Sequence, residues 1–223
     1  MSKNSCAIRI EPNTREWADA TPTNTLESVC NRKDPKSDEI IIAHYVPSSI
    51  AQGYKYFRVS DKEVALCYVS GDFVDEIMPG KYKFSTRESI ELIFVSNVSR
   101  SLVYGISYTR GVMAIDHRDN ADKNIGFSGQ IIFQISSPVR FVDYFSDILY
   151  SDEIMHTGHL RDKIRASVIN AAKEIFSQKT IKDIQKMGAK QLTSMFRPKM
   201  QDLLKMGISL QSISITSRIK VAP

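Results

Sequence analysis

Alternating hydrophobic and polar positions predict short strands from Ile40 to about residue 136. The segment Glu63–Val69 followed by Ser-Gly-Asp predicts a hairpin, and a Pro-Gly turn follows at Pro79–Gly80. Two further strands are predicted over 90–96 and 101–108. The second places one set of side chains on a single face, namely Leu102, Tyr104, Ile106 and Tyr108. The clearest alternation is in 126–136, where Phe127, Ile131, Phe133 and Ile135 point one way.

After Ser137–Pro138 the hydrophobic period becomes that of a helix. Proline at the first helical position leaves no amide hydrogen unsatisfied, so this dipeptide predicts a helix start. A longer helix is predicted over 152–177. Its apolar stripe consists of Leu160, Ile164, Val168, Ala172 and Ile175. Thr180 followed by Asp183 predicts a capped start for the next helix.

That last predicted helix has hydrophobic or small residues at every fourth position, which are Ile184, Gly188, Leu192, Phe196, Met200 and Leu204. Pro198 interrupts it and predicts a kink or break near Ser194–Arg197. Gly207 is predicted to end it in the left-handed conformation. The terminal strand changes its alternation at Ser212, which indicates a β-bulge. Strands followed by helices and one closing strand predict an α+β fold.

Residues 1–38 are polar, and by composition they resemble a tail. Trp17 and Leu26 are the two residues expected to anchor this segment if it docks. The whole chain has the 42% hydrophobic and 25% charged content of an ordinary globular protein. A net charge of +5 suits weak attraction to membranes or nucleic acid and establishes neither.

Several features place the protein in a reducing compartment. The three cysteines Cys6, Cys30 and Cys67 are widely spaced and predict neither a disulfide framework nor a zinc site. The first residues have no apolar core of signal-peptide length, and no apolar run is long enough to cross a bilayer. We therefore expect a cytoplasmic protein that lies on a membrane only peripherally.

Motifs that resemble catalytic or metal sites are incomplete. The tetrapeptide His117–Asn120 is like a kinase catalytic loop, but no glycine-rich phosphate loop or Asp-Phe-Gly accompanies it, so a turn is expected. His156 and His159 would share a helix face, yet no third ligand is evident, and a solvated pair is the expected arrangement. We predict no catalytic residues, cofactor or metal.

Lys182, Lys186 and Lys190 are four residues apart and would form one stripe on a helix, opposite Ile184 and Leu192. A lysine stripe of this kind either contacts an anionic surface or is a solvated helix face, and solvated faces are the commoner case. Aromatic residues do not alternate with these lysines, which argues against stacking on single-stranded nucleic acid.

The order of elements resembles the stomatin–prohibitin–flotillin superfamily, also called band-7. The resemblance covers about 39–219. In the helical half it is carried by IIFQISSPVRFVDYF, by LRDKIRASVINAAKEIFSQKTIKDI and by MFRPKMQDLLKMGISLQSISITSRI. The first half, IAQGYKYFRVSDKEVALCYVSGDFVDEIMPGKYKFSTRE, is similar to a soluble, virion-core-like branch without a membrane hairpin. Pro198 departs from the pattern. In this superfamily a coiled-coil helix usually follows the terminal strand, and this sequence stops where that helix would begin.

The resemblance implies three parts: the segment 1–38, a strand-rich subdomain over 39–100 and a band-7 core over 101–219. It also implies a non-enzymatic scaffold that forms homo-oligomers or recruits a protein partner, with peripheral membrane contact. A structural protein of a viral particle and a basic nucleic-acid-binding protein remain alternatives, as does a hydrolase with a scattered site. Acids such as Asp72 and Glu76, mixed through the strand half, make nucleic acid the less expected partner.

Overall fold

The chain forms two compact units. The computed structural model describes residues 25–34, 36, 39–84 and 89–222, so Trp17 lies outside the described residues. Unit 1 comprises residues 1–98 and 142–156, and unit 2 comprises 99–141 and 157–223. Residues 142–156 thus belong to the first unit, whereas the sequence analysis assigns them to the second part of the chain.

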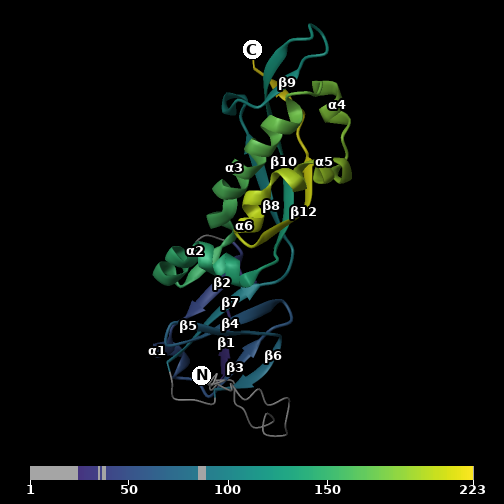
Figure 1. Cartoon of the computed structure of the whole chain (residues 1–223). Helices are drawn as coiled ribbons and strands as arrows, with labels where there is room; N and C mark the ends of the chain where they lie inside the picture. The colour runs from purple at the N-terminus through teal and green to yellow at the C-terminus, as the bar shows by residue number, and fades with distance from the viewer. Residues whose placement is uncertain (1–24, 35, 37–38, 85–88, 223) are drawn as a thin grey trace, which may run out of the picture. The chain divides into compact units, whose positions relative to one another are not determined.

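Unit 1 consists of two sheets and helical segments (Figure 1). A three-stranded sheet has the order β1-β3-β6, and a five-stranded sheet has the order β11-β2-β7-β4-β5. The elements are β1 (Thr25–Glu27), β2 (Ile41–Val46), α1 (Ser48–Ala51), β3 (Tyr56–Val59), β4 (Glu63–Val69), β5 (Asp72–Ile77), β6 (Gly80–Lys83), β7 (Ile90–Ser96), most of α2 (Pro138–Asp152) and β11 (Ile154–His156).

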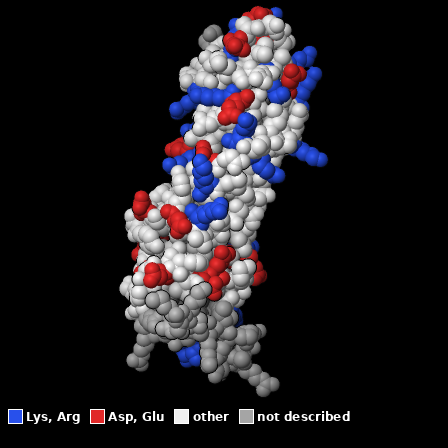
Figure 2. All heavy atoms as spheres, in the orientation of Figure 1, with Lys and Arg blue, Asp and Glu red and all other residues white. Residues whose placement is uncertain are grey.

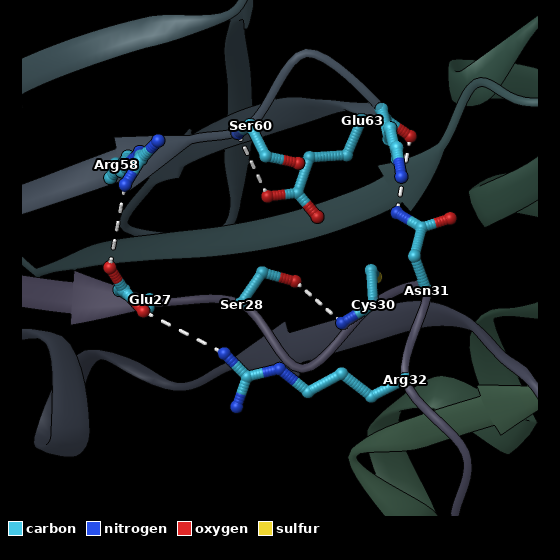
Figure 3. Close-up of a pocket in the computed structure, with 9 residues that line it drawn as sticks. Glu27, Ser28, Cys30, Asn31, Arg32, Arg58, Ser60 and Glu63 are labelled. Atoms are coloured by element: carbon cyan, nitrogen blue, oxygen red, sulfur yellow. Dashed lines mark hydrogen bonds and ion pairs between the residues drawn. The ribbon is translucent and has the colours of Figure 1, made fainter.

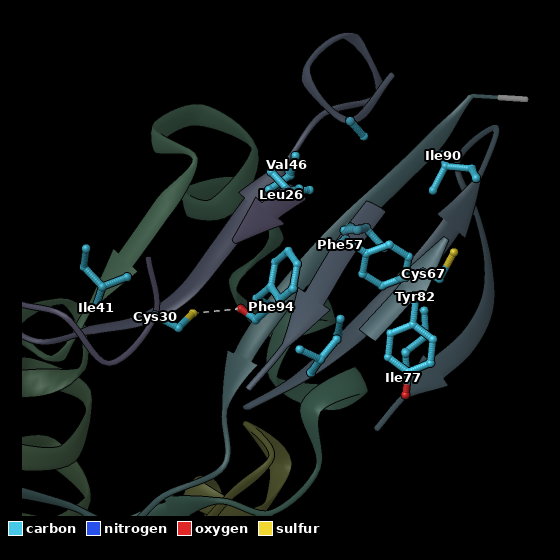
Figure 4. Packing of buried hydrophobic residues seen from close by; sticks show 14 residues of the cluster. Leu26, Cys30, Ile41, Val46, Phe57, Cys67, Ile77, Tyr82, Ile90 and Phe94 are labelled. Atoms are coloured by element: carbon cyan, nitrogen blue, oxygen red, sulfur yellow. Dashed lines mark hydrogen bonds between the residues drawn. The ribbon is translucent and has the colours of Figure 1, made fainter. Parts of the chain in front are cut away.

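The core of unit 1 lies between its two sheets. Phe57 of β3 stacks on Tyr82 of β6, with ring centroids 5.1 Å apart. From the five-stranded sheet, Cys67 and Phe94 contribute to the same buried group, and Leu26 of β1 is also part of it (Figure 4). Burial of this many apolar side chains is the main stabilising contribution for a unit built from short strands.

The hairpin between β4 and β5 turns on two residues with positive φ. Ser70 has φ 53° and Gly71 has φ 86°, the combination that a two-residue type I′ turn requires. The predicted hairpin is therefore confirmed. Helix α2 packs against the same sheet, because Tyr150 meets Tyr45 of β2 edge to face at 4.9 Å.

Unit 2 is built on one long strand. β10 pairs with β8, β9, β12 and β13, all antiparallel, and α3 packs against β8 and β9. The elements are β8 (Arg100–Ile106), η3 (Tyr108–Arg110), β9 (Met113–Ile115), β10 (Asp122–Ile135), α3 (Thr157–Phe176), α4 (Ile181–Lys186), α5 (Ala189–Phe196), η4 (Arg197–Lys199), α6 (Gln201–Lys205), β12 (Ile208–Ile215) and β13 (Lys220–Val221).

The hydrophobic faces predicted for β10 and α3 are confirmed. Phe127 and Phe133 of β10 are buried, and so are Ile164 and Val168 of α3. The rings of Phe127 and Phe176 lie 5.6 Å apart and join the two elements. The fold is therefore of the mixed α+β class, because strands and helices share the core of each unit.

The single helix predicted after Thr180 is wrong, since the structure has three short helices there. Thr180 does cap α4, accepting the Asp183 N–H at 3.1 Å, but Met187 and Gly188 are extended. Glycine costs about 1 kcal/mol in a helix interior, which favours a break at Gly188. The predicted break at Pro198 is present as η4, between α5 and α6.

Four further expectations are corrected. Ile154–His156 form strand β11, not the start of a helix, and they pair with β2. His156 therefore lies on β11 and does not share a helix face with His159. Tyr108 is not on the face of β8, because β8 ends at Ile106 and Tyr108 begins the 3-10 helix η3. Leu204 is 42% exposed, and Leu203 is buried instead because the break at Pro198 changes the helical phase.

The junction between α6 and β12 matches its prediction. Gly207 has φ 73°, and its carbonyl accepts the N–H groups of Ser136 and Ser137 at 2.8 and 3.1 Å. The expected bulge in β12 is also present: Leu210 and Ser212 face adjacent residues of β10, so Gln211 is the extra residue.

Candidate functional site

A charged pocket of about 320 Å³ opens in unit 1 where β1, β3 and β4 end or begin (Figure 3). Its walls come from two segments that are distant in sequence, residues 27–32 and 58–63. The parallel pairing of β1 with β3 brings these segments together. The lining residues are Glu27, Ser28, Cys30, Asn31, Arg32, Arg58, Ser60, Lys62 and Glu63.

Glu63 is the most buried charged residue of this pocket, with 3% of its surface exposed. It follows the turn between β3 and β4. The Ser60 N–H donates to Glu63 Oε1 at 3.0 Å, and the Glu63 N–H donates back to the Ser60 carbonyl at 3.1 Å. The carboxylate therefore closes the turn with one of its oxygens.

Asn31 connects three segments beside the pocket. Its φ of 66° is left-handed, a conformation that asparagine tolerates better than most residues. Asn31 Nδ2 donates to the Lys62 carbonyl at 3.2 Å, and Ser96 Oγ donates to Asn31 Oδ1 at 2.7 Å. These bonds tie the loop after β1 to the β3–β4 turn and to β7.

Two arginines share one carboxylate at the pocket mouth. Arg32 and Arg58 lie 3.7 and 3.9 Å from the Glu27 carboxylate, with side chains 63% and 53% exposed. Hydrogen-bonded ion pairs are typically about 2.7–2.9 Å long, so both contacts are loose. Two cations on one anion leave positive charge available at this position.

The three lysines singled out from the sequence are exposed, but they do not lie on one helix. Lys182 and Lys186 belong to α4, and Lys190 belongs to α5, beyond the extended residues Met187 and Gly188 (Figure 1). Within the described ranges none of the three forms an ion pair, whereas nearby Lys199 pairs with Glu174 at 2.7 Å. Their charge is therefore directed to solvent.

A second pocket, of about 430 Å³, lies in unit 2 between the end of β8, η3, β10 and the segment from Ser217 to Lys220. Arg218 and Lys220 line it together with Tyr108, and both cations are exposed. Its other lining residues are apolar, glycine or serine, and no carboxylate from the described part of the chain lines it. The pocket is thus suited to an anion.

Charge is divided unevenly between the units. Unit 2 contains 18 Lys and Arg against 7 Asp and Glu, whereas unit 1 contains 12 Lys and Arg against 18 Asp and Glu. Figure 2 shows Lys and Arg side chains along the helical face of unit 2. A modest net charge of +5 therefore conceals a strongly basic unit and an acidic one.

The turn expected at His117–Asn120 is present: the Arg118 N–H donates to Asp116 Oδ1 at 3.0 Å, and Asn120 has φ 58°. Among the described residues, no three His, Cys, Asp or Glu side chains gather as metal ligands would.

His44, next to Tyr45 on β2, is a half-buried histidine of unit 1. Burial lowers its pKa from 6.5 to about 4, so it is neutral near pH 7. Its Nδ1 accepts the Val29 N–H at 3.4 Å. Burial also raises the pKa of Tyr45 to about 12, with Glu91 adding to the shift.

No protein-family model matches the chain, and no curated protein matches it in sequence. Across the described part of the chain, no helix is both long enough and apolar enough to cross a bilayer. Function is therefore inferred from the chemistry of this chain's own residues.

Proposed function

We propose that the protein is a non-enzymatic scaffold domain of the band-7 type that contacts an anionic membrane surface through unit 2. The observation that carries this proposal is the division of charge, with 18 Lys and Arg against 7 Asp and Glu in that unit. Lysines near an anionic surface each contribute about 1 kcal/mol, so a basic unit binds such a surface weakly and reversibly.

The three lysines of α4 and α5 are the best contact residues in this proposal. They are exposed, and no described residue pairs with them. Asp183, the acid beside them, accepts a hydrogen bond from Thr180 Oγ1 at 2.7 Å within the cap of α4. The Arg218 pocket, with cations and no carboxylate, favours an anionic partner as well.

An uncharged sheet face in the same unit supports the scaffold part of the proposal. Where β10 pairs with both β8 and β12, the outward residues are serine, glutamine, glycine, valine and isoleucine, namely Ser101, Val103, Gly105, Ser128, Gln130, Ile132, Gln134, Ser209, Gln211, Ser212 and Ser214. Protein interfaces are depleted of charge at their centre. A face without charge in so basic a unit therefore suits contact with another protein chain.

The membrane contact is tested by sedimentation with vesicles rich in phosphatidylserine. Changing Lys182, Lys186 and Lys190 to glutamate should abolish pelleting at low salt, because attraction becomes repulsion. The matched control changes three exposed lysines of unit 1, Lys36, Lys55 and Lys62, to glutamate. Each variant shifts the net charge from +5 to −1, since every Lys→Glu change removes one positive and adds one negative charge.

The control variant should still pellet, and pelleting of the wild type should fall as salt screens the charges. Equal loss in both variants would mean that only net charge matters. A wild type that stays in the supernatant, or a unit 2 variant that pellets fully, would overturn the membrane contact. Binding to duplex DNA in place of vesicles would favour the nucleic-acid alternative.

A further inference from the structure

One oxygen of the buried Glu63 carboxylate is bonded within the protein, and the other faces the pocket. Oε1 accepts the Ser60 N–H, and no other donor among the described residues reaches either carboxylate oxygen. Buried carboxylates normally accept several hydrogen bonds or have a counter-charge, because desolvation of an unpaired anion is costly. Capping the β3–β4 turn accounts for one oxygen only. Oε2 therefore has no protein donor within the described part of the chain and is open to water in the pocket.

This carboxylate lines the pocket, and Figure 3 shows it directed toward the space above Ser28. Ser28 is itself buried, and its Oγ accepts the Cys30 N–H at 2.9 Å, which leaves the hydroxyl proton able to donate. A group that carries several N–H donors would satisfy Oε2 in this position. An ammonium group has three donors and the complementary charge.

The mouth of the pocket, in contrast, favours an anionic group. Arg32 and Arg58 share the single Glu27 carboxylate through contacts of 3.7 and 3.9 Å. A second carboxylate arriving there would accept hydrogen bonds from both guanidiniums, whose planar donors match carboxylate geometry. One wall of the pocket thus carries the Glu63 carboxylate, which can accept a hydrogen bond from a ligand. Another wall carries Arg32 and Arg58, which can bind a further anion.

The walls are held before any ligand binds. Asn31 bonds to the Lys62 carbonyl and to Ser96, and the Cys30 thiol donates to the Phe94 carbonyl at 3.3 Å. Fixed walls reduce the entropy that binding must overcome. The volume of about 320 Å³ is at the small end of ligand pockets.

We propose that this pocket binds a small zwitterion of the α-amino acid class. The ammonium group lies on Glu63 and the carboxylate on Arg32 and Arg58. This site is in unit 1 and does not depend on the membrane contact proposed for unit 2.

The test screens the standard L-amino acids one at a time at millimolar concentration for thermal stabilisation of the full chain. Calorimetric titration then measures the affinity of those that stabilise it. The best of them is compared with its decarboxylated amine and its deaminated acid. Each single-charge analogue should bind at least about tenfold more weakly, because each leaves one charged wall unpaired.

Variants assign the two ends of the ligand. Glu63→Gln keeps an oxygen for the Ser60 N–H but loses the charge, so affinity should fall at least about tenfold. Arg32→Gln with Arg58→Gln should weaken the amino acid and leave the amine analogue unaffected. Glu76→Gln, at an exposed position of β5 outside the pocket, is the matched control and should bind as the wild type does.

The proposal is overturned if no standard amino acid stabilises or binds the protein. It is equally overturned if Glu63→Gln binds as tightly as the wild type. Should Glu63→Gln fail to fold, the double arginine variant decides, and unchanged amino acid affinity in that variant would exclude the site.

Discussion

At the scale of single residues, Gly207 shows how one backbone position fixes a junction. A Cβ added there would lie 2.8 Å from the Phe141 nitrogen and would also meet the Ser137 carbonyl oxygen, both of them backbone atoms. Its φ of 73° is disfavoured for residues with a side chain. Only glycine can adopt this positive φ and fit beside these backbone atoms without strain.

We therefore expect Gly207→Val to lower the free energy of unfolding by about 3 kcal/mol or more. Chemical denaturation measures the change. Gly188→Ala is the matched control, because Gly188 has φ −76° and open space around it, and it should change stability by less than about 1 kcal/mol. Similar stability of the valine variant and the wild type would contradict the role of the junction.

His44 is a second residue with a measurable consequence. Its pKa is 6.5 in the unfolded chain and about 4 in the fold, because burial disfavours the charged ring. The unfolded chain therefore takes up a proton first as pH falls. Stability is complete above about pH 6.5, decreases between about pH 6.5 and 4, and is constant below that as far as His44 is concerned.

The expected loss is at most about 3 kcal/mol. Urea denaturation at several pH values across this window measures it. In His44→Gln the pH-dependent loss should be smaller than in the wild type, since the side chain no longer ionises. If both proteins lose stability in parallel across the window, other groups cause the acid sensitivity.

At the scale of elements, the predictions that were confirmed concern features set by residues close together in the sequence. The alternation over 126–136 and the stripe on 157–176 identify β10 and α3, because burial of one face fixes each element. Thr180 with Asp183 and Pro198 likewise mark a helix start and a helix break by chemistry within one turn. These features needed no knowledge of distant residues.

Elements defined by distant partners were missed. β11 has three residues and exists because it pairs with Ile41–His44 of β2, about a hundred positions earlier. One continuous helix was predicted across Gly188 because the hydrophobic residues on both sides keep the spacing of four. In the structure Gly188 is extended and separates two helices, which agrees with the low helix propensity of glycine. The three lysines consequently occupy two helices.

The Glu63 pocket was missed for the same reason. In the sequence Glu63 is only the first residue of a predicted strand, and residues 27–32 lie within the segment 1–38, which has the composition of a tail. Parallel pairing of β1 with β3 assembles the walls. A glutamate at a strand start has no sequence signal for burial, so this site needed the structure.

At the scale of the whole molecule, unit 2 combines many cations with a sheet face that has none. On this face Val103 of β8 is 69% exposed beside Gln130 of β10. Lys182, Lys186 and Lys190 belong to the helices α4 and α5, so they leave this face free for contact between chains while they remain available to an anionic surface. Assembly and surface binding would then reinforce each other, because several weak contacts act together in one oligomer.

The corresponding prediction concerns the mass of the protein in solution. Light scattering after size exclusion should give a multiple of the 25.2 kDa chain mass. Val103→Lys should shift the mass toward a single chain, because a buried unpaired charge at an interface is costly. Leu204→Lys is the matched control: it places the same charge on α6, at a position 42% exposed and away from the sheet face, and should leave the mass unchanged. A wild type of single-chain mass at every concentration, or a Val103→Lys variant that assembles fully, would exclude this face as the contact between chains.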